Sequence, residues 1–160
     1  MMNKGMKLPV RALVLAMGLV FASGAMAADD RVASALNDIG MAYNIDQDGD
    51  YAIVISFDDD RTQLVFVRSA VYDSRGVVMR DIWSPGYVHG SDDMPADLLS
   101  RLLSENVGTV MGNWARENRE ISYVVKLTAD ASATELRAAI LEAAEQADEL
   151  EKELLGSDDL

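Results

Sequence analysis

The sequence predicts an α+β fold in which three helices pack on an antiparallel sheet. Three segments carry apolar residues at helical spacing, at the start, in the middle and at the end of the chain. The segments between them are short, rich in β-branched and aromatic residues, and separated by polar turns, which is typical of hairpins. No repeat and no long linker divides the chain, so we expect one domain over residues 28–155.

The first 27 residues have the features of a secretion signal. A basic segment over residues 1–11 precedes an apolar run over residues 12–22, and the small residues Ala25 and Ala27 suit signal peptidase. Eleven apolar residues fall short of the ~20 that cross a bilayer. We therefore expect cleavage after Ala27, no membrane insertion afterwards, and a periplasmic or secreted protein.

The chain is strongly acidic, with 14 basic and 27 acidic residues and a net charge of −13. Removing residues 1–27 removes three basic residues and no acidic one, which brings the charge to −16. Such a charge disfavours nucleic acids and anionic membrane surfaces as partners. Without cysteine and with one histidine, the chain cannot form disulfides or a histidine-based metal cage. We expect no cofactor.

The first half predicts one helix and three strands. Val32, Leu36 and Ile39 recur at helical spacing after the acidic pair at residues 29–30, and Gly40 is placed to end this helix. The strands follow from runs rich in β-formers, and an Asp-Gly turn precedes the first of them. These predicted strands are residues 51–57, 62–68 and 77–83, after a short strand-like segment at 43–46.

The second half predicts two helices and two strands. Ser84-Pro85-Gly86 breaks the strand pattern and opens a loop to about residue 93. A capping box of Ser132 and Glu135 begins the last helix, and residues 156–160 are expected to form a flexible tail. The predicted elements are a helix at 95–107, strands at 110–114 and 121–128, and a helix at 132–154. The resulting order is α-β-β-β-α-β-β-α, with five main strands.

Four short motifs accompany this order: Leu36-Asn-Asp-Ile-Gly40, Asp48-Gly-Asp-Tyr51, Leu102-Leu-Ser-Glu-Asn106 and Ala144-Glu-Gln-Ala-Asp148. Together, the order and the motifs resemble the YbjN family, whose members are described as putative bacterial sensory transduction regulators. The resemblance extends over about residues 29–154. It implies a fold similar to that of type III secretion chaperones and a regulatory role, and it supplies no catalytic residues.

The acidic turn around Gly49 is the one segment that resembles a calcium loop. Asp46, Asp48 and Asp50 offer oxygen ligands at suitable spacing, but the position that needs a bidentate glutamate holds Ile55. A hairpin turn is the simpler interpretation, and we expect no specific metal site. The acidic run at residues 58–60 likewise predicts a solvated turn that discourages pairing between sheet edges.

No catalytic residue is predicted. His89 lies in the loop after the third strand, and Ser84, Ser91 and Asp92 are its candidate partners only by proximity in sequence. No nucleophile elbow, phosphate loop or dinucleotide fingerprint is present in the sequence. We expect a protein that is not an enzyme.

Two groups of residues are candidates for contact with a protein partner. Trp83, Tyr87 and Val88 either form an exposed ridge or fold back over the sheet edge, and we favour the second arrangement. The 4-3 spacing of the last helix fits a coiled coil as well as packing on the sheet, which we favour because the stripe is rich in alanine. Leu150 and Leu154 are then expected to extend past the sheet and to contact a second chain.

The strands are apolar on both faces. Ile53 and Ile55 point to one side of their strand, whereas Ala52 and Val54 point to the other. Two helices can cover one face, and we expect the helix at residues 95–107 to cover only part of the other. The uncovered part predicts a non-enzymatic, chaperone-like protein that binds a client polypeptide or a second copy of itself as a homodimer. The alternative is a module for a small ligand or a weakly held divalent cation that uses the acidic turns.

Overall fold

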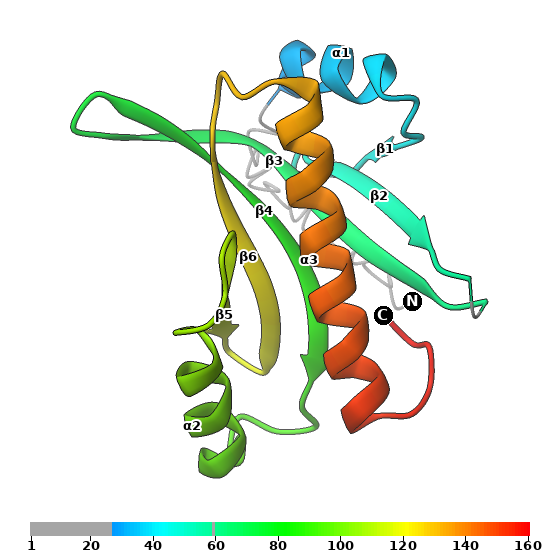
Figure 1. The fold of residues 1–160 in the computed structure, drawn as a ribbon, viewed down its shortest axis with the longest axis vertical. Coiled ribbons are helices and arrows are strands. Elements are labelled where there is room, and N and C mark those ends of the chain that lie inside the picture. The colour runs from blue at the N-terminus through cyan, green and yellow to red at the C-terminus, as the bar shows by residue number, and fades with distance from the viewer. Residues whose placement is uncertain (1–26, 59) are drawn as a thin grey trace, which may run out of the picture.

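The strands form a single antiparallel sheet of six strands in the order β1-β2-β3-β4-β6-β5 (Figure 1). The computed structural model describes residues 27–58 and 60–160, so all but the last residue of the predicted signal sequence over residues 1–27 lies outside the described residues. The predicted α+β class is confirmed. The elements are α1 (Asp30–Asp38), β1 (Asn44–Ile45), β2 (Tyr51–Ser56), β3 (Thr62–Ser74), β4 (Val77–Val88), α2 (Ala96–Glu105), β5 (Gly112–Glu117), β6 (Glu120–Thr128) and α3 (Ala133–Leu154).

The prediction of five main strands is wrong in number, because β1 is a sixth strand and pairs with the start of β2. The predicted break at residues 84–86 is also wrong, since β4 continues through it to Val88. A bulge between Pro85 and Tyr87 absorbs the irregularity. Close packing against α3 explains the glycine at residue 86, because a Cβ there would lie 3.2 Å from the carbonyl oxygen of Ala147.

All three helices lie on one side of the sheet (Figure 1). α3 crosses the sheet on fully buried alanines, which allow a close approach of helix and strands. α1 packs beside α3 through Val32 and Leu36. α2 packs on the same side, because Leu102 joins Leu150 of α3 and Ile121 of β6 in one cluster. The expectation that α2 covers part of the opposite face is therefore wrong.

The ends of the first and last helices follow the sequence closely. Ser132 and Glu135 form the predicted capping box of α3, in which each side chain bonds the backbone of the other residue. Asp29 is the N-cap of α1 and accepts a hydrogen bond from the backbone of Arg31. The same Asp29 carboxylate binds the buried guanidinium of Arg80 at 2.6 Å, which ties α1 to β4.

The two edges of the sheet differ. At the β5 edge, Oδ1 of Asn106 accepts a hydrogen bond from the N–H of Trp114 at 2.6 Å, and Nδ2 donates to the carbonyl of Trp114 at 3.2 Å. This side chain thus takes the place of a neighbouring strand. At the other edge, the two residues of β1 pair only with Tyr51 and Ala52 of β2.

The residues that the sequence assigns to a flexible tail make hydrogen bonds with the body of the protein. The carbonyl of Ser157 accepts a bond from Arg61 at 2.8 Å, and Asp158 accepts one from the backbone of Thr62 at 3.1 Å. The N–H of Asp159 donates to Glu151 at 2.6 Å. The tail therefore runs back along the start of β3.

Candidate binding face

The face of the sheet opposite α3 is not packed by any helix of residues 27–58 and 60–160; we call it the open face. Side chains alternate along a strand, so the residues between the core positions point to this face. In β2, for example, Tyr51 and Ile53 are 1% exposed toward the helices, whereas Val54 on the open face is 61% exposed. The apolar residues of the open face include Ala52, Val54, Leu64, Phe66, Trp83, Val88, Ala115 and Val124.

A row of apolar side chains crosses the open face from β2 to β6. The strand register places Ala52 opposite Phe66, Phe66 opposite Trp83, and Trp83 opposite Val124. The rings of Phe66 and Trp83 are stacked, with centroids 4.5 Å apart and an angle of 17° between their planes. The row therefore places two stacked aromatic rings on the face that no described helix covers.

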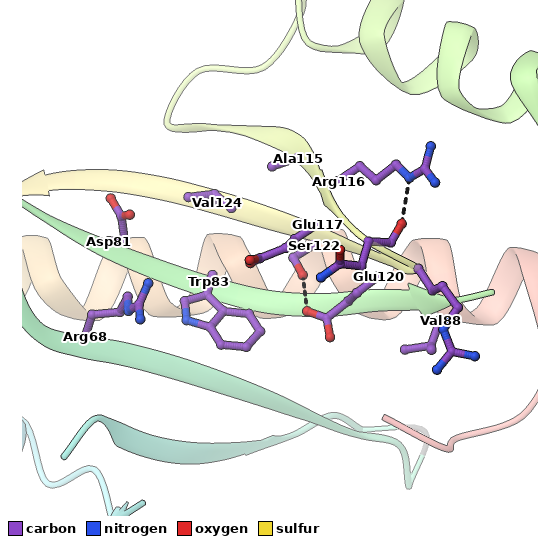
Figure 2. A pocket seen from close by; sticks show the side chains of 12 residues that line it. Arg68, Asp81, Trp83, Val88, Ala115, Arg116, Glu117, Glu120, Ser122 and Val124 are labelled. Atoms are coloured by element: carbon purple, nitrogen blue, oxygen red, sulfur yellow. Dashed lines mark hydrogen bonds between the residues drawn. The ribbon is translucent and has the colours of Figure 1, made fainter. Parts of the chain in front are cut away.

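A depression of about 620 Å³ lies over β4, β6 and β5, with Trp83 among the residues that line it (Figure 2). The β5–β6 turn and Val88 border it at one end, and Arg68 and Asp81 border it at the other (Figure 2). The lining residues are Arg68, Asp81, Trp83, Val88, Ala115, Arg116, Glu117, Asn118, Arg119, Glu120, Ser122 and Val124.

The charges around the depression are balanced and largely engaged. Three basic and three acidic residues line it. Lys126 binds Asp81 at 2.7 Å across the neighbouring strands, and Glu120 accepts a hydrogen bond from Ser122 at 2.6 Å. Burial lowers the pKa of Arg68, but Tyr72 and Asp50 raise it above its ordinary value, so its guanidinium stays charged. The site has no excess of one charge that would favour a small ion.

The candidate partner-contacting residues of the sequence do not form one surface. Trp83 and Val88 lie together on the open face. Tyr87 lies on the helix side, because the bulge after Pro85 changes the alternation. Leu150 is 3% exposed, and Leu154 packs in the same cluster, so α2 covers this end of α3.

His89 is hydrogen-bonded to Tyr87, whose hydroxyl lies 2.8 Å from Nδ1. Within the described residues, the serine and aspartate neighbours that sequence proximity suggested make no hydrogen bond with its ring, so no pair of nucleophile and base forms at this histidine. Its backbone N–H donates to Arg119, which links the end of β4 to the β5–β6 turn.

The acidic turn at residues 46–50 uses its carboxylates within the protein. Oδ1 of Asp46 accepts hydrogen bonds from the backbone of Asp48 and of Asp50, both at 2.9 Å. Asp50 is buried and accepts bonds from the backbone of Ser69 at 2.7 Å and from Arg68 at 3.3 Å. These contacts describe a hairpin turn that is anchored to β3.

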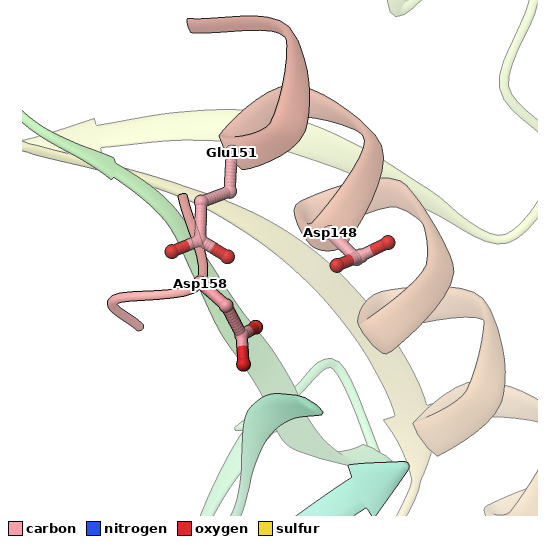
Figure 3. A group of neighbouring side chains, drawn as sticks. All are labelled: Asp148, Glu151 and Asp158. Carbon is pink, nitrogen blue, oxygen red and sulfur yellow. The ribbon is translucent and has the colours of Figure 1, made fainter. Parts of the chain in front are cut away.

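In the described part of the chain, three carboxylates converge at Asp148, Glu151 and Asp158 (Figure 3). One oxygen of each lies within 4.8 Å of the others. The guanidinium of Arg61 binds Asp148 at 2.6 Å and Glu151 at 2.9 Å, so two of the three carboxylates already have an internal cation as their partner. The sequence carried a signal for it: Glu151 lies four residues after the buried Ala147, on the buried stripe of α3.

None of the helices in the described residues is long and apolar enough to cross a membrane. A comparison with protein-family models gives no match. A comparison with curated proteins gives no similar protein either. The resemblance to the YbjN family therefore stays a prediction that rests on the motifs of the sequence.

Proposed function

We propose that this chain is a non-enzymatic, exported protein-binding module that holds an extended, apolar segment of a client polypeptide on its open face. The observation that supports the proposal is the apolar row through Phe66 and Trp83, over which no described helix packs. Large rings at the centre of a surface are typical anchors of protein interfaces. A type III secretion chaperone-like fold, as the resemblance to YbjN implies, would suit this role.

The charge of the protein favours one class of client. Because the chain without residues 1–27 carries −16, acidic polypeptides are repelled and basic ones are attracted. The depression itself carries balanced charges, so the contact on the open face depends on apolar side chains. The expected client segment is apolar where it crosses Trp83 and is followed or preceded by lysine or arginine.

The test measures how well the protein prevents aggregation of a chemically unfolded basic model protein, followed by light scattering. Trp83→Ala removes the anchor, and Val88→Glu places a charge at the border of the depression. Each variant should need at least about fivefold more protein for the same protection, since losing one anchor costs about 1–2 kcal/mol or more of binding.

Val107→Glu is the matched control, because it makes the same change at a position that is 91% exposed and does not line the depression. It should protect as well as the original protein. Circular dichroism and thermal unfolding establish that the variants are folded. Equal protection by Val88→Glu, Trp83→Ala and the control would contradict the proposal.

A further inference from the structure

The outer edge of β2, which we define as residues 53–56, is open, whereas at the opposite edge Asn106 bonds both backbone groups of Trp114. β1 is two residues long and reaches only as far as Ala52. A strand edge presents a row of backbone donors and acceptors to any chain that can pair with it. The question is therefore which backbone groups of β2 point outward and whether they have partners.

Two hydrogen bonds fix the direction of these groups. The N–H of Phe57 donates to the carbonyl of Arg61 at 2.8 Å, so odd-numbered residues of this strand bond toward β3. The N–H of Asp46 donates to the carbonyl of Asp50 at 3.0 Å, so even-numbered residues bond toward β1. Val54 and Ser56 thus point their N–H and C=O groups outward, and no strand of the described residues pairs with them there.

Within residues 51–56 the β2 edge lacks the usual protection against pairing, and the acidic run at residues 58–60 begins only beyond this strand. Its sequence, Tyr51–Ser56, contains no charged residue and no proline, and its register with β3 is continuous. Natural sheets commonly protect an exposed edge with a lysine, a proline or a bulge. β5 follows that rule, since it carries Arg116 and Glu117 and is capped by Asn106.

We propose that β2 pairs with β2 of a second copy of this chain, antiparallel across a two-fold axis at Ile55. In this register Val54 of each copy lies opposite Ser56 of the other, and the two pairs exchange four N–H···O bonds. If the pairing shifted by two residues toward the start of the strand, Ser56 of one copy would lie opposite Ala52 of the other. That position is not free, because β1 already pairs with Ala52. In the register centred on Ile55, the outward N–H and C=O groups of Val54 and Ser56 in both copies therefore have partners. Because β2 contains no charged residue, no like charges lie opposite each other.

This interface goes beyond the proposed function and is separate from it. A two-fold axis perpendicular to the sheet keeps the helices of both copies on one side, so the two open faces become one continuous surface. Asp58 and Asp60 lie just beyond the paired residues at each end. Because both copies are acidic, added salt should strengthen the association by screening their repulsion.

The first test compares two variants at one position by sedimentation equilibrium of the purified protein. Val54→Pro removes an N–H that has no partner within the described chain, whereas Val54→Thr keeps it and suits a strand. The original protein and Val54→Thr should dimerise with similar association constants. Val54→Pro should weaken association about 30-fold, because two symmetry-related hydrogen bonds are lost.

The second test uses the absence of cysteine from the chain. In the proposed register residue 55 lies opposite its own copy in a non-hydrogen-bonded pair, with Cα atoms about 4.5 Å apart, so Ile55→Cys should form a disulfide-linked dimer on mild oxidation. In Ser56→Cys the same atoms are about 7–8 Å apart, so little linkage is expected.

Circular dichroism checks that every variant is folded. A protein that stays monomeric at all concentrations and salt levels would overturn the proposed pairing. So would folded Val54→Pro with undiminished association, or equal linkage of the two cysteine variants. If Trp83→Ala lost client protection while its sedimentation stayed unchanged, the result would support the role of the open face and would leave the pairing of β2 unaffected. The two proposals can therefore fail independently.

Discussion

The guanidinium of Arg61 donates a hydrogen bond to Oε2 of Glu151 at 2.9 Å, although ninety residues separate the two in sequence. The side chain of Glu151 is 0% exposed and that of Arg61 is 11% exposed. The same guanidinium binds Asp148 of α3 and the carbonyl of Ser157. One arginine before β3 therefore holds the end of the last helix and the chain terminus together.

Arg61→Ala should lower the free energy of unfolding by about 3–5 kcal/mol, because Glu151 and Asp148 would stay buried without a cation. Urea denaturation followed by circular dichroism measures the loss. Arg137→Ala is the control, since it removes an exposed arginine of α3, the helix that Arg61 contacts. It should change the free energy of unfolding by less than about 0.5 kcal/mol. Equal losses for the two variants would show that the buried group does not depend on Arg61.

Asp29 predicts a specific pH dependence. Hydrogen bonds from Arg31 and from Arg80 hold the pKa of the Asp29 carboxyl well below its ordinary value of 3.8, against the opposing effect of burial. A carboxyl group whose pKa is lower in the folded state stabilises the fold at pH values above its unfolded pKa. That contribution is lost as the pH falls below about 4 toward the folded pKa.

Asp29→Asn keeps an N-cap for α1 but removes the charge that faces Arg80, whose side chain is 4% exposed. At pH 7 the variant should be less stable by about 2 kcal/mol, the usual worth of a hydrogen bond to a charged group. The difference from the original protein should shrink as the pH falls below about 4, because the unfolded chain then binds a proton at Asp29 that the folded protein does not. Denaturation at several pH values measures it, and Asp30→Asn serves as the exposed control; a difference that persists unchanged in acid would contradict the assignment.

The local features of the fold could be predicted because short-range physics determines them. The capping box of α3 and the Asp-Gly turn before β2 depend on residues within four positions of one another. The sequence of β2 also shows that both faces of this strand are apolar, because Ile53 and Val54 are neighbours and point to opposite faces. That pattern led to the expectation of an uncovered surface on the sheet.

The features that the sequence did not reveal depend on contacts between distant segments. Ser84-Pro85-Gly86 has the composition of a loop, but Gln63 donates a hydrogen bond to the carbonyl of Pro85 at 2.7 Å, and Gly86 lets α3 approach. The side on which α2 packs was decided by Leu102 meeting Leu150 and Ile121. Periodicity identifies the apolar stripe of a helix but not the surface that the stripe meets.

Asn106 should be a determinant of both stability and solubility. Asn106→Ala leaves the N–H and C=O of Trp114 without their side-chain partner, so the free energy of unfolding should fall by about 1–2 kcal/mol. The exposed edge of β5 should also make the variant aggregate at lower concentration. Asn106→Asp keeps the hydrogen-bond acceptor but not the donor, so its stability should lie between that of the original protein and that of Asn106→Ala. Urea denaturation and light scattering measure these effects; an alanine variant as stable and soluble as the original would contradict this role for Asn106.

Gly112 at the start of β5 has no room for a side chain. A Cβ there would lie 2.5 Å from Cε1 of Tyr123 and 2.7 Å from the backbone oxygen of Val124, so Gly112→Ala must displace the ring or the strand. We expect a loss of about 1–3 kcal/mol and a change in near-ultraviolet circular dichroism, because Tyr123 contacts Trp114 edge to face at 5.2 Å. Gly90→Ala meets no atom within 4 Å and should be nearly neutral. If both alanine variants unfolded at the same temperature, the close packing of β5 on β6 would not be the reason for this glycine.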